Sequence, residues 1–392
     1  MIDYSKLFYP QSVVVIGASN SSDKLGGIVM SNLSKSFSGK IYPVNPKGGI
    51  IFDNSSLKSI DELPVIPDLA IIALNSNLSI EALKKAGKKK IPFAIIFAGG
   101  FSEIGENDLE NQLAEICIET GIKLIGPNFM GIWNNHGLNA SFMNILPSIQ
   151  GKISFISQSG SLIAYSIYLK MRLGKFVSLG NSTDVNFEDF FEYFSSDSDT
   201  KVLALYIESL KDGRKFLEKL KNFSKPVIAI KSGSSDFGQR SIASHTGALA
   251  GNSQLYDHLF NAYGILQVKS FESMVAGARI LELLPTMKNN KVVALSNAGG
   301  AVCLFSDACA ENDINPDILP NKLKLELESI FPPQAPINNP LDLTVTGGTP
   351  QVVKNVMKSL FNTSFEVCQS KARVAFSSVI AKLHSCQYLL SI

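Results

Sequence analysis

Short apolar runs, rich in β-branched residues, recur along the first 130 residues: SVVVIG, KIYPVN, LAIIAL, FAIIFAGG and IKLIGPN. Stretches with the periodicity of amphipathic helices separate several of them, and this alternation predicts βαβ units on a parallel sheet. The runs are continuously apolar, as expected of strands that helices cover on both faces. We therefore expect a doubly wound first domain over residues 1–147.

The same pattern restarts twice. After the break at Pro147 to Gly151, strands are predicted in KISFIS, KFVSLG, VLALYIE, PVIAIK and ILQV, which indicates a second α/β domain over 148–286. A third unit, over 287–392, begins with KVVALSNAGG and continues with a helix, the loop FPPQAPINNPLDLT and a last helical segment. This third unit is short for an α/β domain.

The second and third units begin alike. KISFISQSG, ending at Gly160, parallels KVVALSNAG, ending at Gly299, and both read as a strand, a turn of small residues and a helix. Asp184 and Asp342 each precede a helix later in their units. A duplicated fold unit would explain the likeness, and a chance match of two common patterns is the alternative.

Composition narrows the class of protein. Of 392 residues, 45% are hydrophobic and 18% charged, a balance typical of packed globular domains. The net charge of +2 supplies no basic field for nucleic acid or an anionic membrane. Five cysteines without a CxxC pair favour a reduced, cytoplasmic setting. No N-terminal apolar leader and no run of about 18 apolar residues is present, so a soluble protein without a membrane span is expected.

The first predicted strand ends in small residues. Gly17, Ala18 and Ser19 follow it, and Gly26 and Gly27 stand where the next helix should start. Small residues there let a phosphate approach backbone N–H groups, although the spacing departs from GxGxxG. An ordinary βα turn is the alternative.

Other strands of the first domain end in polar or small residues, which are Asn45, Pro46, Lys47, Asn75, Ala98, Gly99 and Gly100. In an open parallel sheet, ligands bind outside the carboxyl ends of the strands, where these segments should converge. Together they predict a nucleotide-like ligand, with Lys47 available for a phosphate.

The segment RSIASHTGALAGN, residues 240–252, offers a nucleophile. His245 lies among Ser, Thr, Gly and Ala, which leave room for a phosphoryl group at the imidazole. A neutral ring nitrogen is nucleophilic when a carboxylate holds the other nitrogen as an N–H donor, and Glu208, at the end of VLALYIE, is the best candidate. The three other histidines receive the plain interpretation of surface or core residues.

The repeated turns SQSGSL and NAGGAV would each place a helix N-terminus after a strand. Their free N–H groups and positive dipole ends could stabilise one phosphoryl group without a metal, and no metal site is predicted. Ordinary turns are the alternative. The residues concerned are Ser159, Gly160, Ser161, Gly299 and Gly300.

Taken together, the motifs resemble the ADP-forming acetate–CoA ligases, in particular their α subunits, and more distantly the α subunit of succinyl-CoA synthetase. The matching segments run in order over about 350 residues: VVVIGASN, YPVNPK, FAGGFSEIG, GPNFMG, FISQSGSL, LYIES, SHTGALAG, SNAGGA and NPLDLT. The resemblance implies a Rossmann-like CoA-binding domain followed by flavodoxin-like ligase domains with parallel sheets.

For the chemistry, the resemblance implies acyl-CoA + phosphate + ADP ⇌ acid + CoA + ATP, through an acyl phosphate and a phosphohistidine. His245 would carry the phosphoryl group, Glu208 would stabilise it, and Asn128 of GPNFMG would join the CoA-binding residues. No segment resembles an ATP-grasp domain. ADP or ATP with Mg²⁺ is therefore expected on a separate β subunit, in a heterotetramer.

One part of the chain departs from the family pattern. Beyond NPLDLT the family continues with more strands, whereas SFEVCQSKARVAFSSVIAKLHSCQYLLSI matches nothing in it, so the last unit is expected to be truncated or replaced. A non-catalytic CoA-binding regulatory subunit is one alternative, and a relative of the protein acetyltransferases is another, disfavoured because no such domain is appended. An NAD-dependent oxidoreductase is disfavoured because no acidic residue ends the second strand.

Overall fold

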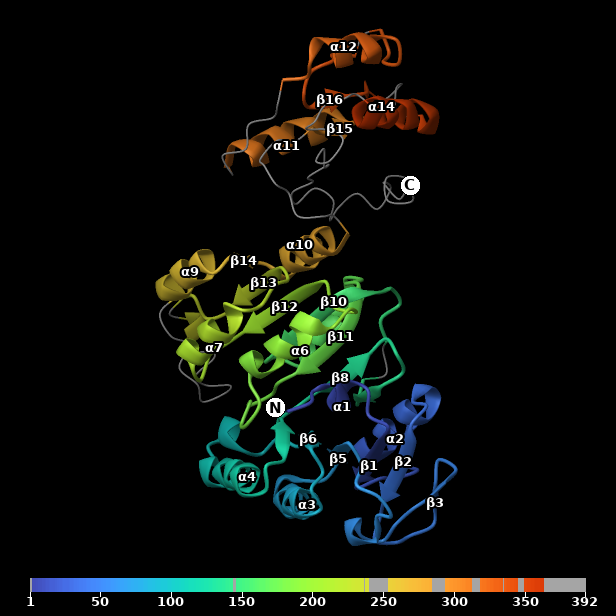
Figure 1. Ribbon diagram of the computed structural model, residues 1–392, viewed down its shortest axis with the longest axis vertical. Helices are drawn as coiled ribbons and strands as arrows, with labels where there is room; N and C mark the ends of the chain where they lie inside the picture. The colour runs from blue at the N-terminus through green and yellow to red at the C-terminus, as the bar shows by residue number, and fades with distance from the viewer. Residues whose placement is uncertain are drawn as a thin grey trace. The chain divides into compact units, whose positions relative to one another are not determined.

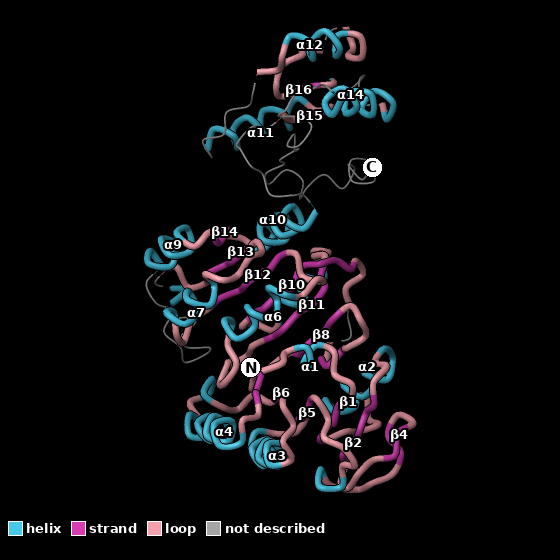
Figure 2. The backbone as a smooth tube through the Cα atoms, in the orientation of Figure 1, coloured by secondary structure: helices cyan, strands magenta, loops and turns pink. Residues whose placement is uncertain are grey.

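The computed structural model describes residues 2–143, 146–235, 237–239, 253–283, 293–311, 318–333, 335–344 and 349–362. The chain divides into two units, Met1–Glu282 and Leu283–Ile392. Within the first unit, every strand run predicted above forms a strand, and strands alternate with helices along the chain (Figure 2). The predicted α/β class with parallel sheets is confirmed.

The first sheet has the strand order β2-β1-β5-β6-β7, and all of its neighbouring strands are parallel. The order reverses beside β1, which is where open α/β sheets bind ligands. Pro43, which has no N–H to donate, lies in the edge strand β2. The strands are β1 (Ser12–Ile16), β2 (Lys40–Val44), β5 (Leu69–Ile72), β6 (Phe93–Ile96) and β7 (Lys123–Ile125), with a small hairpin of β3 (Ile50–Ile51) and β4 (Asn54–Ser55).

Helices cover both faces of this sheet, as the apolar runs predict. One face packs on α3 (Ser76–Lys88) and α4 (Asn107–Thr120), which lie side by side in Figure 1. The other face packs on α1 (Ser5–Phe8) and α2 (Leu25–Ser36). Short 3₁₀ turns lie at η1 (Ile60–Glu62) and η2 (Ser102–Ile104).

Local signals explain where these helices begin and end. The side chain of Asn75 caps α3 by accepting a hydrogen bond from the N–H of Leu78 at 3.0 Å. Helix α4 has Asp108 and Glu110 in its first turn, where negative charge suits the helix dipole. Gly121 follows α4 with φ +78, the left-handed conformation that commonly ends a helix.

The second sheet has the order β14-β13-β12-β10-β11-β8-β9. Its first five strands are parallel, and β8 and β9 add an antiparallel edge that the sequence patterns did not predict. The strands are β8 (Gly131–Asn134), β9 (Asn139–Ser141), β10 (Gln150–Ser157), β11 (Leu173–Ser178), β12 (Val202–Ile207), β13 (Val227–Lys231) and β14 (Ile265–Gln267).

Helices α5 (Ser161–Tyr168) and α10 (Phe271–Leu283) pack on one face of the second sheet. The 3₁₀ turn η3 (Phe187–Phe190) and helices α6 (Phe191–Ser196), α7 (Gly213–Leu220) and α9 (Ser253–Ala262) lie on the other. That second face shares one continuous apolar core with the first sheet. Tyr4, for example, lies 5.3 Å from the ring of Phe93 and 5.2 Å from that of Phe190, measured between centroids. The two sheets therefore form one unit.

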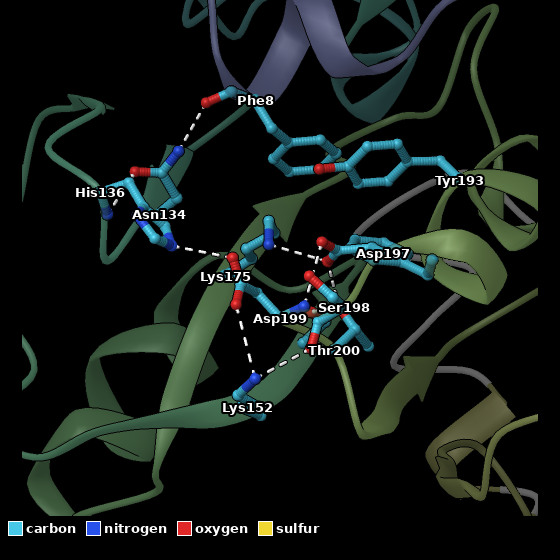
Figure 3. Close-up of polar contacts among 12 residues, drawn as sticks. Phe8, Asn134, His136, Lys152, Lys175, Tyr193, Asp197, Ser198, Asp199 and Thr200 are labelled. Atoms are coloured by element: carbon cyan, nitrogen blue, oxygen red, sulfur yellow. Dashed lines mark hydrogen bonds and ion pairs between the residues drawn. The ribbon is translucent and has the colours of Figure 1, made fainter.

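A polar network ties the N-terminal segment to the second sheet at the amino ends of its strands (Figure 3). Lys175 has a fully buried side chain and pairs with Asp197 at 2.8 Å. His136 contacts Asp199 at 2.9 Å, and Asn134 donates to the carbonyl of Phe8. The network lies at the edge opposite to the one where ligands bind in parallel sheets, which gives it a structural role.

The second unit has a small parallel pair, β15 (Leu295–Ser296) and β16 (Leu341–Asp342). Helices α11 (Gly299–Glu311), α12 (Asn321–Glu328) and α14 (Pro350–Asn362) accompany it, and Leu295, Leu341 and Val356 belong to one apolar cluster. Strand β15 leads through a short turn into α11, as β10 leads into α5. The shared strand, turn and helix are those that the repeat predicts.

Candidate functional site

The first strand ends in a turn that requires glycine. Gly17 has φ +89, a left-handed conformation that favours glycine, and the N–H groups of Gly17 and Ala18 donate to the carbonyl of Val44 at 3.1 and 3.2 Å. A Cβ on Gly26 would lie 2.0 Å from the carbonyl oxygen of Gly17. Helix α2 therefore begins directly against the turn, at the sheet edge where open parallel sheets bind ligands.

One amide side chain ties the residues after β2 to this turn. Asn45 Nδ2 donates to the carbonyl of Ala18 at 2.8 Å, and Asn45 Oδ1 accepts from the N–H of Lys47 at 2.9 Å. Ser19 Oγ accepts from the N–H of Ser21 at 3.0 Å on the other side of the turn. Lys47 and its neighbour Pro46 are exposed. The structure thus gathers the small-residue turn and the exposed lysine at one edge of the sheet.

The turns after β5 and β6 adjoin each other. Asn75 ends the first turn and caps α3, whose first residue is Ser76. A Cβ on Gly100, in the second turn, would lie 3.5 Å from the hydroxyl oxygen of Ser76. Ala98 and Gly99 precede Gly100 in that turn. The start of α3, directly after Asn75, therefore lies against the turn at Ala98 to Gly100.

Glu103 holds the turn after β6 in shape. Its Oε1 accepts hydrogen bonds from the N–H groups of Gly100 and, at 3.2 Å, Phe101. Burial raises the pKa of Glu103, but hydrogen bonds from Asn181 and Gly100 outweigh that effect and hold the pKa below its ordinary value. The carboxylate is ionised at neutral pH and fixes the backbone of the turn.

An asparagine from the second sheet joins these groups. Asn181, just after β11, donates through Nδ2 to Glu103 Oε2 at 2.7 Å and to Glu110 Oε2 at 2.9 Å. Asn181 Oδ1 accepts from Asn128 Nδ2 at 3.3 Å, and the Asn128 N–H donates to the carbonyl of Ala98 at 2.8 Å. The carboxyl ends of the two sheets therefore meet at this cluster, which contains the predicted Asn128.

The turn after β10, Ser159–Ser161, lies beside the end of β12. Gln158 Oε1 accepts from the N–H of Glu208 at 2.7 Å and from that of Ser209 at 3.1 Å. Gln158 Nε2 donates to the carbonyl of Ser209 at 3.0 Å. The structure thus brings the predicted turn and the predicted carboxylate of Glu208 to the same edge of the second sheet.

A buried lysine ends β13 at this edge. Lys231 Nζ donates to the carbonyl of Glu208 at 2.9 Å and to that of Ser232, and it lies 4.8 Å from the ring centroid of Tyr256. Burial lowers the pKa of Lys231 to about 8, and the negative charge of Glu208 acts in the opposite direction. The ammonium form therefore predominates at neutral pH.

Some predicted residues cannot be placed with this cluster. His245 lies outside the described residues, so its pairing with Glu208 stays a prediction. Gly299 and Gly300 begin α11 in the second unit, where a Cβ on Gly299 would lie 3.4 Å from a carboxylate oxygen of Asp342. Their part in holding a phosphoryl group also stays a prediction.

Five residues of the cluster were not predicted from sequence: Gln158, Asn181, Lys231, Glu103 and Glu110. Gln158 and Asn181 lie in turns, where an amide side chain does not by itself indicate a functional residue. Lys231 had a usable signal, because it closes the otherwise apolar run VIAIK with a charge. Over the described part of the chain, no group of three or more metal-ligating side chains occurs. Nor is any helix found there long and apolar enough to cross a membrane.

Known proteins of similar sequence decide the family. The α subunit of ADP-forming acetate–CoA ligase II from Pyrococcus furiosus is 40% identical over 352 residues, a match covering 88% of this chain and 76% of the relative. The chain belongs to the ADP-forming acetate–CoA ligase α-subunit family. The resemblance seen in the motifs is confirmed.

Other members of this ligase family match over similar lengths. The ADP-forming acetate–CoA ligase of Methanocaldococcus jannaschii is 40% identical over 350 residues, covering 88% of this chain but 49% of the relative. The chain thus spans about half of that ligase and about three quarters of the Pyrococcus α subunit.

Solved structures and family models agree with this ligase assignment. The acetyl-coenzyme A synthetase 1 of Ca. Korarchaeum cryptofilum, solved with phosphate and ADP, superposes with a TM-score of 0.87 at 31% identity, covering 92% of this chain and 80% of that one. Residues 11–135 match the model described as CoA binding domain. Residues 150–281 match the succinyl-CoA ligase like flavodoxin domain. The expected order of a CoA-binding and a flavodoxin-like domain is confirmed.

Proposed function

We propose that this chain is the CoA- and phosphate-handling subunit of an ADP-forming acyl-CoA ligase. The reaction is acyl-CoA + phosphate + ADP ⇌ acid + CoA + ATP. One observation carries the proposal: in a member of this family, Glu208 and the Ser159–Ser161 turn lie at one sheet edge, joined through Gln158. Such an edge offers a carboxylate for a histidine and N–H donors for a phosphoryl group.

The first step forms an acyl phosphate. An oxygen of inorganic phosphate attacks the thioester carbonyl, the carbon–sulfur bond breaks, and CoA leaves as a thiolate that takes up a proton. Histidine then attacks the phosphorus, and the acid leaves as a carboxylate. We assign His245 as this nucleophile and Glu208 as the group that accepts the other ring N–H and balances the imidazolium charge. Helix α5 directs its first N–H groups toward the phosphoryl oxygens from Ser159, Gly160 and Ser161.

CoA belongs at the first sheet in this proposal. The Gly17 turn lies at the end of β1, beside the point where the strand order reverses and open parallel sheets bind ligands, and the exposed Lys47 can reach a CoA phosphate. The acyl end would extend toward Asn128 and the turn at Ala98, Gly99 and Gly100, at the meeting point of the two sheets. The other residues that we assign to CoA binding are Ala18, Ser19, Asn45, Pro46 and Asn75.

The nucleotide belongs to a partner. Two Pyrococcus relatives are named as α subunits, and no part of this sequence resembles an ATP-grasp domain. We place ADP or ATP, with its Mg²⁺, on an ATP-grasp β subunit in a heterotetramer. The three domains predicted from sequence would then have separate roles. Residues 1–147 would bind CoA, residues 148–286 would carry the phosphohistidine, and residues 287–392 would supply a second set of phosphate donors. Five cysteines without a CxxC pair fit the cytoplasmic location that we assign to it.

Phosphate labelling tests the proposal. The full chain, incubated with radioactive phosphate and acetyl-CoA, should acquire one label that is acid-labile and base-stable. His245→Asn should abolish the label, whereas His258→Asn, on the exposed side of α9, should retain it. Glu208→Gln should slow labelling about 10–100-fold, because an amide cannot balance the imidazolium charge.

The outcomes separate the alternatives. A wild-type chain that binds CoA and never acquires the label would be the regulatory subunit instead. Label that persists in His245→Asn would refute the nucleophile. ADP alone should leave the label in place, and ATP formation by the isolated chain would refute the assignment of the nucleotide to a partner.

A further inference from the structure

Lys231 is a cation buried where a parallel sheet would ordinarily bury an apolar residue. It follows four buried apolar residues of β13 and is itself only 7% exposed. Its ammonium group donates to two backbone carbonyls, those of Glu208 and Ser232. Burying a charge opposes folding unless its hydrogen bonds are satisfied, and an apolar side chain here would avoid that cost.

The two carbonyls belong to different parts of the candidate site. Glu208 follows β12 and carries the carboxylate assigned to the phosphohistidine. Ser232 follows β13 and begins the segment that leads to His245. The ladder between β12 and β13 ends with the N–H of Ser232, which donates to the carbonyl of Ile207 at 3.0 Å, and one residue further on β12 the carbonyl of Glu208 accepts from the Lys231 ammonium group instead. Lys231 bridges the two segments at that point.

We infer that Lys231 is a positioning residue for phosphoryl transfer, because its ammonium group holds the ends of β12 and β13 together and so fixes Glu208 relative to the chain that leads to His245. The inference rests on the proposed function. It also places a positive charge beside Glu208, where the phosphoryl group must arrive. Hydrogen bonds from a charged donor are about twice as strong as those from a neutral one, so the ammonium form is the effective clamp.

The groups facing Lys231 decide how its role depends on pH. The charge of Glu208 acts on Lys231 from the end of β12, and Tyr256 approaches from α9, whereas Tyr206 of β12 lies on the other face of the sheet with Ile230. Burial raises the pKa of both tyrosines above the ordinary phenol value, so neither loses its proton below pH 9. Lys231, with its pKa near 8, is therefore the group among these that changes charge between pH 7 and 9. The labelling rate should fall as pH rises through this window.

A change in fold stability would not produce this fall in the labelling rate. Lys231 has a lower pKa in the folded chain than its ordinary 10.5, so the unfolded chain binds more protons between about pH 8 and 10.5. Its titration therefore raises the stability of the fold in that window. A rate that falls above pH 8 while the fold stays intact is the signature of a functional ammonium group.

The experiment measures the rate of His245 labelling from radioactive phosphate and acetyl-CoA by rapid quench, from pH 6.5 to 9.5. The full chain is compared with Lys231→Arg, Lys231→Met and the control Lys201→Met. Lys201 donates to a carbonyl at the opposite edge of the same sheet, at 3.4 Å. Circular dichroism checks that each variant is folded at every pH.

Wild type and the Lys201→Met control should lose about tenfold in rate above pH 8, which corresponds to the loss of one charge-assisted hydrogen bond. Lys231→Met should be about tenfold slower at pH 7 and insensitive to pH, with an unchanged KM for acetyl-CoA. Lys231→Arg keeps the charge and should restore the rate without the fall above pH 8.

Three results would overturn the inference: a wild-type rate that is flat to pH 9.5, a Lys231→Met rate equal to wild type, or a fall that persists in Lys231→Arg. The first needs no variant, so it decides the matter even if both substitutions prevent folding. An unlabelled wild-type chain would instead refute the proposed function.

Discussion

Replacing Asn181 by aspartate would test the joint between the two sheets. Asn181→Asp keeps the shape of the side chain but turns the nitrogen that donates to Glu103 at 2.7 Å and to Glu110 at 2.9 Å into an oxygen. Three carboxylates would then meet within hydrogen-bonding distance. Two unit charges 4 Å apart repel by about 4 kcal/mol at an effective dielectric constant of about 20, so the three cannot all stay ionised.

Protonation limits the cost of this change. Adding a proton to a carboxyl whose ordinary pKa is about 3.9 costs about 4 kcal/mol at pH 7 and about 1.5 kcal/mol at pH 5. The protonated oxygen donates one hydrogen bond in place of two, which costs a further 1.5 to 3 kcal/mol, roughly. We therefore expect a loss of unfolding free energy of about 6 kcal/mol at pH 7, and about 3 kcal/mol less at pH 5.

The sign follows from proton binding, since the folded variant holds a proton that the unfolded chain has released above about pH 4. Stability should therefore fall as pH rises. Urea unfolding of the variant at pH 5, 6 and 7 measures this slope, with the exposed Asn222→Asp as the control. A loss below about 1 kcal/mol, or one independent of pH, would show that Asn181 does not join the two carboxylates.

Two more substitutions test close packing. Gly26→Ala would place a Cβ 2.0 Å from the carbonyl oxygen of Gly17, so the start of α2 must shift. Its affinity for CoA, measured by calorimetry, should fall at least tenfold, roughly, whereas the control Gly213→Ala, whose Cβ would have no neighbour within 4 Å, should bind CoA as the wild type does. Lys175→Met would leave Asp197 buried without its cation and should lower the unfolding free energy, measured in urea, by about 3 to 5 kcal/mol. An unchanged urea midpoint of unfolding would count against a stabilising role of the network in Figure 3.

The sequence by itself determined the parallel strands of the two large sheets, the parallel class and the family. Continuous runs such as LAIIAL and VLALYI are buried on both faces, and that pattern is local, so it can be read without a structure. The turns at Gly17 and Gly160 were likewise visible, because small residues at a strand end have a local steric reason. The prediction that strand ends converge needed only the rule that parallel strands end at one edge.

Only the tertiary structure decided which polar groups meet there. Asn181 and Glu103 are 78 positions apart in the sequence, and Lys231 and Glu208 are 23 apart, so their spacing in the chain predicts neither contact. The strand order brings β12 beside β13, and the shared aromatic core sets the two sheets so that the end of β11 meets the ends of β6 and β7. Side chains of ordinary appearance acquire their roles from that packing, because hydrogen bonds and charges act over a few ångströms in space, whatever their separation along the chain.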